Sequence, residues 1–215
     1  MTPASRASRP LVAAGAVVFL VAVGLVLLTV VRPSSASPSG SGTTAAAPAE
    51  DSADVGFARD MSVHHQQAVE MAFLVRDRTD DEDVRRLAYD IVNTQANQRG
   101  MMLGWLESWG RPKSSEQPPM AWMGHPVTAV DGSLMPGMAT GTELDGLRSA
   151  EGRDAEVRFL RLMTVHHRAG ADMARAAAES AGTEEIRNLA AGMARAQESE
   201  ISLMADMLKA RGTRP

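Results

Sequence analysis

Apolar residues recur every three or four positions over most of the chain beyond residue 53, which is the spacing of one face of an α-helix. One such face covers residues 57–75 and the next covers residues 84–109. Between them, Asp80 or Asp81 can cap the start of the second helix. No segment alternates apolar and polar residues long enough to predict a strand. The pattern predicts a helical hairpin.

The same pattern occurs twice. The residues that begin it have equivalents 102 positions later: Phe57, Met61, His64 and His65 correspond to Phe159, Met163, His166 and His167. In the second copy, Thr183 is the expected cap between the two helices. Each hairpin has one apolar face, so the two faces should be buried against each other. The prediction is an all-α fold, an antiparallel four-helix bundle with hairpin 1 at 54–110, a connector at 111–150 and hairpin 2 at 151–211.

An uncharged segment of 21 residues, 11–31, precedes the helical region. As a helix it would be roughly 30 Å long, enough to cross a bilayer core and longer than the apolar part of a secretory signal. Arg6 and Arg9 precede it, so residues 1–10 are predicted to be cytoplasmic. Residues 32–53 are rich in Ser, Pro, Ala and Gly and predict a flexible linker. The helical part is thus expected outside the cytoplasm, anchored in the cell membrane, or secreted if the apolar segment is cleaved.

Composition restricts the chemistry. The chain has 14 methionines and no cysteine, which excludes disulfides, thiolate zinc sites, iron–sulfur clusters and cysteine nucleophiles. A net charge of -4 gives no indication of nucleic-acid binding. Aromatic residues make up only 4%, which disfavours a large β-sandwich. Any soft-metal chemistry must therefore rest on thioether and imidazole groups.

Polar residues interrupt the apolar faces at about one level of each hairpin. Antiparallel pairing about the predicted turns gives these opposed residues: His64 and Gln95, Met61 and Gln98, His166 and Gln197, and Met163 and Glu200. Polar groups at core positions cost stability unless they bond to each other or to a ligand. This layer is therefore the candidate functional site.

Two interpretations of the layer are open. In the first it binds a metal ion, because imidazole and thioether ligands suit Cu(I). The ligands would then be Met61, His64, Met163 and His166, with His65 and His167 as further candidates. The residues that could orient the imidazole rings are Gln95, Gln98, Gln197 and Glu200. In the second interpretation, hydrogen bonds from the histidines only fix the register of the bundle. Adjacent helical residues point about 100° apart, so His65 and His167 face a neighbouring helix, a second ion or solvent.

The connector contains a second group of candidate metal ligands: Met120, Met123, His125, Met135 and Met138. These residues lie among Pro, Gly, Ser and Asp, where no regular helix is expected. Either they collect a soft metal ion, or they fold over the bundle as a lid together with Trp122. The other methionines on the helical faces, Met71, Met173, Met193 and Met207, are expected to fill the core.

A redox enzyme on the same scaffold is a third alternative. A di-iron oxidase needs Glu-x-x-His on two helices and a further Glu on each of the others. Met61 and Met163 stand three residues before the histidines, and Glu200 is the only carboxylate on an apolar face, which disfavours this alternative. No Ser–His–acid motif is recognisable, so no catalytic residue is assigned.

The sequence resembles the bacterial family called domain of unknown function 305 (DUF305). The resemblance rests on Met-x-x-His-His in both copies, on Met135-Pro-Gly-Met138 and on Trp-Leu-Glu-Ser-Trp-Gly at 105–110, and it covers about residues 54–211. It implies a ferritin-like bundle, usually exported or membrane-tethered. Some members of the family are associated with copper binding and copper tolerance outside the cytoplasm.

These observations predict a membrane-anchored, extracytoplasmic protein that binds copper, with Cu(I) favoured, for sequestration or handover. The main alternative is a non-catalytic envelope interaction module with a structural histidine layer. Expected partners are a metal ion and the membrane, with no nucleic acid. A homo-oligomer or an envelope protein partner is also open.

Overall fold

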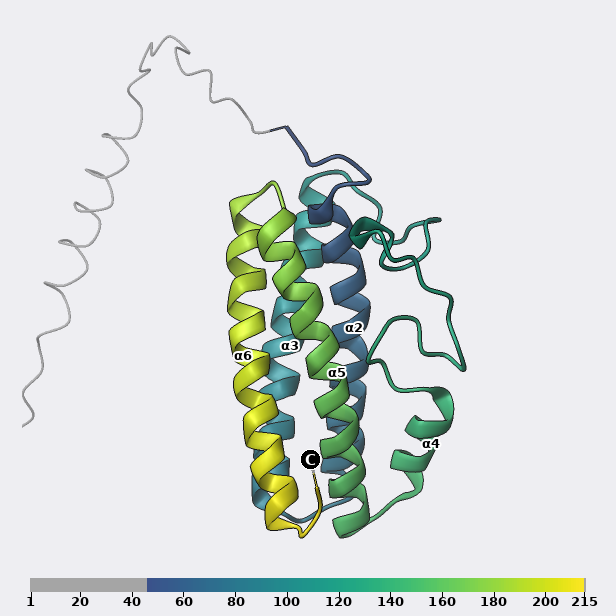
Figure 1. Ribbon diagram of the computed structural model, residues 1–215, viewed down its shortest axis with the longest axis vertical. Coiled ribbons are helices and arrows are strands. Elements are labelled where there is room, and N and C mark those ends of the chain that lie inside the picture. The colour runs from purple at the N-terminus through teal and green to yellow at the C-terminus, as the bar shows by residue number, and fades with distance from the viewer. Residues whose placement is uncertain (1–45, 215) are drawn as a thin grey trace, which may run out of the picture. The chain divides into compact units, whose positions relative to one another are not determined.

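The computed structural model describes residues 46–214, and its main elements are four long helices (Figure 1). The helices are α2 (Ala53–Arg76), α3 (Glu82–Ser108), α4 (Gly141–Ser149), α5 (Gly152–Ser180) and α6 (Glu184–Ala210), with a 3₁₀ helix η1 (Ala121–Met123). Within residues 46–214 there is no strand beyond one isolated bridge in the connector, which confirms the all-α prediction. None of the described helices is long and apolar enough to cross a membrane. The predicted membrane segment, 11–31, lies outside the described residues.

Side-chain caps set where the long helices begin. Ser52, Asp81 and Thr183 each accept a hydrogen bond from a backbone N–H of the first turn of α2, α3 and α6, respectively. Asp81 and Thr183 are the caps that the sequence predicts. In each hairpin an arginine also binds the connection between the two helices. Arg85 donates to backbone carbonyls where α2 connects to α3, and Arg187 donates to backbone carbonyls where α5 connects to α6.

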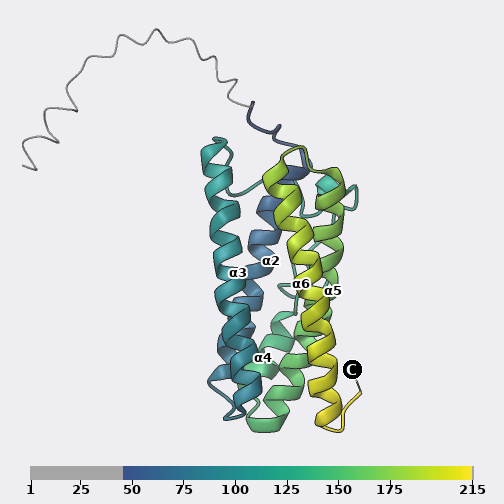
Figure 2. The same cartoon turned by 90° about the vertical axis from the view of Figure 1, so that its left-hand side faces the viewer.

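The long helices form two antiparallel hairpins, α2–α3 and α5–α6, that pack on each other mainly through α2 and α5 (Figures 1 and 2). The connector and α4 lie along the α2–α5 side of the bundle (Figure 1). Contrary to expectation, the connector contains a regular helix. Thr140 and Glu143 form a capping box at the start of α4, and the buried Leu147 holds α4 on the bundle.

Two carboxylates join the hairpins reciprocally, one at each end of the bundle. At the first turn of α2, Asp54 accepts hydrogen bonds from the backbone N–H groups of Gly182 and Thr183, both at 2.8 Å, and from the Thr183 hydroxyl at 2.6 Å. Its equivalent in the second copy, Glu156 near the start of α5, accepts from the Thr79 hydroxyl at 2.6 Å. Each hairpin therefore holds the turn of the other. We call these two carboxylates, with the turns they bind, the latches.

Replacing Asp54 with alanine should lower the free energy of unfolding of the full-length protein by about 1–2 kcal/mol, the usual cost of losing a helix cap. The reason is that Gly182 and Thr183 would lose their acceptor at the start of α6. Urea denaturation of Asp54→Ala, with the exposed Asp51→Ala as control, measures this. Equal stability of the two variants would show that the latch contributes nothing.

The buried apolar side chains form two cores. The core at the end of the bundle where α2 begins, here called the upper core, contains Phe57, Ile186 and seven methionines: Met61, Met102, Met120, Met135, Met138, Met173 and Met193. The lower core contains Phe159, Leu160 and four methionines: Met71, Met163, Met204 and Met207. The expected core-filling methionines are thus buried, and the paired histidines lie between the two cores.

Candidate metal centre

Four histidines are buried where α2 meets α5. His64, His65, His166 and His167 are each 0–1% exposed. The rings of His64 and His166 stack across the contact between the hairpins, with centroids 3.7 Å apart and planes tilted by 35°. Nε2 of His166 donates to the backbone carbonyl of His64 at 3.0 Å. The two copies of the motif therefore meet directly, each contributing one ring to the stack.

The second histidine of each pair turns to the partner helix of its own hairpin. His65 donates from Nε2 to the side-chain oxygen of Gln98 at 2.9 Å, and Nε2 of His167 bonds to the Glu200 carboxylate at 2.5 Å. The sequence left a neighbouring helix, a second ion or solvent open as the surroundings of His65 and His167. In the structure both histidines face the neighbouring helix. Gln98 and Glu200, which the sequence places opposite Met61 and Met163, thus form their hydrogen bonds with the second histidine of each pair. Successive helical side chains point about 100° apart, so His64 faces the other hairpin while His65 faces α3.

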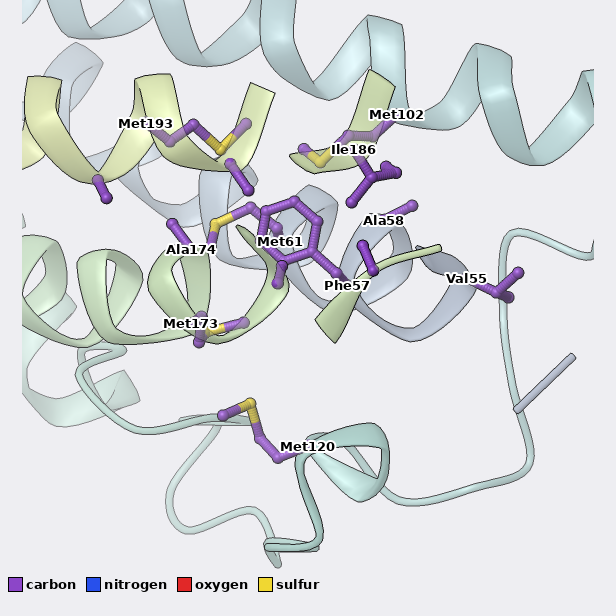
Figure 3. Packing of buried hydrophobic residues seen from close by; sticks show 14 of the residues in the cluster. Val55, Phe57, Ala58, Met61, Met102, Met120, Met173, Ala174, Ile186 and Met193 are labelled. Atoms are coloured by element: carbon purple, nitrogen blue, oxygen red, sulfur yellow. The ribbon is translucent and has the colours of Figure 1, made fainter. Parts of the chain in front are cut away.

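The two motif methionines do not lie together. Met61 belongs to the upper core, beside Phe57 and Ala174 (Figure 3), whereas Met163 belongs to the lower core. Each precedes its own histidine by about one helical turn. Because α2 and α5 are antiparallel, one thioether lies on each side of the stacked rings.

Several polar atoms of this layer are buried without a hydrogen-bond partner among the described residues. They are both ring nitrogens of His64, Nδ1 of His65, His166 and His167, and Oε1 of Gln95 and Gln197. A buried polar atom that finds no partner at all costs about 1–3 kcal/mol of stability. Buried polar groups in native proteins normally find partners, so a cluster of this kind indicates a ligand, an ordered water or a catalytic role.

Burial lowers the pKa of three of these histidines, because it removes the charged imidazolium from water. The pKa of His64 falls to about 3 and that of His65 to about 4, although the Gln98 hydrogen bond raises the latter. The pKa of His166 also lies well below its ordinary value, through burial first and the neighbouring His64 second. At neutral pH these rings are uncharged, which is the form in which imidazole binds metal ions.

Within residues 46–214, no three histidine or acidic side chains are grouped so that they alone could hold a metal ion. The layer offers a different donor set, namely two stacked imidazoles with a methionine one turn away on either side. Nitrogen and thioether donors of this kind match Cu(I) better than Mg²⁺, Ca²⁺ or the thiolate-rich sites of structural zinc.

The connector methionines pack against the helices, as the lid alternative describes. Met120, Met135 and Met138 are buried in the upper core, and Figure 3 shows Met120 reaching from the connector toward Met173. Met123 is partly buried against the same core, whereas His125 is exposed. The candidate metal ligands of the connector are thus divided between the core and the surface.

Trp122 docks this part of the connector on α2. Its Nε1 donates to Asp60 at 2.9 Å, and a Cβ on Gly56 would lie only 2.5 Å from its indole ring. Asp60 also accepts from the backbone N–H of Met120 at 2.9 Å. Sequence reasoning missed Asp60 and Gly56. A comparison of the two copies could have found Asp60, because the equivalent residue of the second copy is Leu162.

The fold and the histidine layer define a duplicated all-helical protein with four buried histidines where the two copies meet. The family model described as domain of unknown function (DUF305) matches residues 54–208, so the chain belongs to the DUF305 family. A search of curated proteins finds no significant match.

Solved structures of relatives have the same fold. A DUF305 protein from Streptomyces coelicolor, described as a candidate secreted protein, is 59% identical with a TM-score of 0.73, over 77% of this chain and 98% of that one. A DUF305 fragment from Deinococcus radiodurans is 30% identical with a TM-score of 0.63, over 73% and 95%. CopM in its Cu(II)-bound form is 25% identical with a TM-score of 0.57, over 71% and 93%. CopM has also been solved with Cu(I) and with silver bound.

Proposed function

We propose that this protein is an extracytoplasmic copper-binding protein that holds Cu(I) at the histidine layer, for sequestration or handover, with residues 11–31 as its membrane anchor. The observation that carries the proposal is the stacked pair His64–His166, in which both ring nitrogens of His64 and Nδ1 of His166 are buried without a hydrogen-bond partner among the described residues. The copper-bound forms of the relative CopM and the secreted description of the Streptomyces coelicolor relative support it.

The proposed ligands follow from the placement of the donors. His64 and His166 supply imidazole nitrogen from the two hairpins, and Met61 and Met163 supply thioether sulfur from the two sides of the stack. His65 and His167 are further candidates through Nδ1. Gln98 and Glu200 then orient these two rings by binding Nε2, which fixes the nitrogen that faces the ion.

An anaerobic titration with Cu(I) against a chromophoric chelator tests the proposal. The wild type should withdraw Cu(I) from the chelator, and the His64→Ala/His166→Ala variant should lose at least about tenfold in affinity, the smallest loss expected when ligands are removed. His125→Ala, which removes an exposed histidine, is the matched control and should bind as the wild type does. Failure of the wild type to compete would overturn copper binding. Equal competition by the double variant would place the site among the connector methionines instead.

A structural histidine layer in an envelope interaction module is the second candidate. The His65–Gln98 and His167–Glu200 hydrogen bonds favour it, because each ties the first helix of a hairpin to the second at one level. This candidate predicts no competition for Cu(I) and a large loss of stability in the same double variant.

A further inference from the structure

The end of the connector crosses the bundle next to the stacked histidines. We call residues Met135–Ala139 the strap. Its two methionines and Ala139 are buried, while Pro136 is exposed on the outer side. The strap therefore covers the α2–α5 contact with apolar side chains facing inward.

On α2, a single side chain holds the strap. The amide of Gln67 donates from Nε2 to the Ala139 carbonyl at 2.8 Å and accepts from the Ala139 N–H at 2.6 Å, so it pairs with one residue as a neighbouring strand would. Gln67 is 7% exposed, and it lies about one turn beyond His64. A buried amide that satisfies both its donor and its acceptor on one backbone residue is a specific attachment.

On α5, the strap approaches the helix closely. Gly137 has a φ of +78°, a conformation that side chains rarely adopt, and a Cβ there would clash with the Ala169 methyl and lie 2.9 Å from the Val165 carbonyl oxygen. Ala169 is the equivalent of Gln67 in the second copy. The two copies thus differ where the strap crosses them: one has a clasping amide and the other has a small residue that leaves room.

The strap also reaches the histidines. The Pro136 carbonyl lies near the His64 ring without forming a hydrogen bond of ordinary geometry, and it raises the pKa of His64 against the larger lowering by burial. A Cβ on Gly137 would come within 3.4 Å of the His166 Cα. In contrast, His65 and His167 turn away from this face to α3 and α6, where the Glu200 side chain is 24% exposed.

We propose that Gln67 is a positioning residue that holds the strap closed over His64, and that reagents and metal ions reach His64 when the Gln67–Ala139 pair opens. The metal-exchange part of this inference rests on the proposed function. The shielding of His64 does not, because it concerns the metal-free protein.

Carbethoxylation of histidines with diethyl pyrocarbonate, followed residue by residue by mass spectrometry on the full-length metal-free chain, tests the shielding. In the wild type the exposed His125 should react rapidly and the four buried histidines slowly. In Gln67→Ala, loss of the two hydrogen bonds should raise the reaction rate of His64 about tenfold, and hydrogen exchange at the Ala139 amide should accelerate. Gln66→Ala is the matched control, because Gln66 is the same residue type in the adjacent exposed position.

The pattern of reactivity distinguishes local opening from general loosening. If the strap opens alone, His64 becomes reactive while His65 and His167 stay protected. The inference would be overturned if the carbethoxylation rates of all four buried histidines rose together in Gln67→Ala. It would also be overturned if His64 reacted at the same rate in Gln67→Ala as in Gln66→Ala. Gly137→Ala supplies a second variant that displaces the strap from the α5 side, and it should expose His64 in the same way.

Metal exchange is measured separately, as the rate at which preloaded Cu(I) passes to a chromophoric chelator. Gln67→Ala should release Cu(I) about tenfold faster than Gln66→Ala. Equal rates would overturn the role of the strap in exchange. A wild type that binds no Cu(I) would overturn the proposed function, and the His64 reactivity would still decide whether Gln67 shields that residue.

Discussion

Acidification below about pH 6.5 should strongly lower the free energy of unfolding of the metal-free protein. The pKa values of His64, His65 and His166 are lowered in the folded state, whereas an unfolded histidine titrates near pH 6.5. Above that pH neither state binds protons at these residues and stability is at its full value. As the pH falls below it, the unfolded state takes up protons that the folded state refuses, so stability decreases until the folded pKa values are reached.

The expected slope is steep. Three histidines that titrate only in the unfolded state make the free energy of unfolding fall by about 4 kcal/mol per pH unit near pH 5.5. The total loss between pH 7 and pH 5 is about 6 kcal/mol. Domains of this size are stable by about 5–15 kcal/mol, so such a loss removes a large part of the stability and unfolds the protein if it lies at the low end of this range. Urea denaturation monitored by circular dichroism at half-unit pH steps measures the slope.

A flat stability profile between pH 6.5 and pH 5 would show that the histidines are hydrated or paired with a proton acceptor in solution. Bound Cu(I) should oppose the acid transition, because a ligand that binds only the folded state stabilises it. His125→Ala should leave the slope unchanged, since that histidine is exposed.

Replacing His64 with leucine should make the metal-free protein more stable, by about 2–4 kcal/mol. Neither ring nitrogen of His64 forms a hydrogen bond of ordinary geometry among the described residues, and only the Pro136 carbonyl lies near the ring, so the substitution removes buried polar atoms and adds apolar surface to a closed core. The backbone carbonyl that accepts from His166 remains in place. The loss of unfolding free energy per pH unit should also be smaller by about a third, since one of the three titrating histidines is removed.

This substitution separates the two candidate functions. A site kept for ligand binding carries a stability cost, so its removal stabilises the protein and weakens Cu(I) binding. A layer kept for structure predicts the reverse, a less stable protein. Thermal and urea unfolding of His64→Leu and Gln66→Ala, measured side by side without metal, give the sign directly. Destabilisation by His64→Leu would favour the envelope module.

The hairpins and their caps were predictable because helical spacing and capping depend on residues close in sequence. Asp81 and Thr183 cap the helices as expected. The pairing across each hairpin was less accurate, since Gln98 binds His65 rather than facing Met61. Pairing residues at equal distances from the predicted turn gives the approximate level at which two helices face each other. It ignores the tilt of helical side chains toward the N-terminus, so it misplaces side-chain contacts by about one turn.

The strap could not be predicted from helical pattern. Gln67 lies in a run of polar residues and appears exposed until its amide is seen to bind Ala139, a partner 72 residues away. Gly137 marks a turn in the sequence, but only the approach to Ala169 explains why a larger residue would not fit. Comparison of the two copies was the available signal, because the pair Gln67 and Ala169 differs where the flanking histidines are identical.

The latches have a consequence for how the chain folds. Each hairpin is closed by contacts between neighbours in sequence, which form quickly, but Asp54 meets its partner Thr183 across 129 residues and Glu156 meets Thr79 across 77. Contacts of such separation form late, after the entropy of closing the intervening chain has been overcome. Neither turn has its full set of acceptors until the other hairpin arrives. The hairpins are therefore expected to form early as loose units and to become rigid only in the step that also buries the histidines.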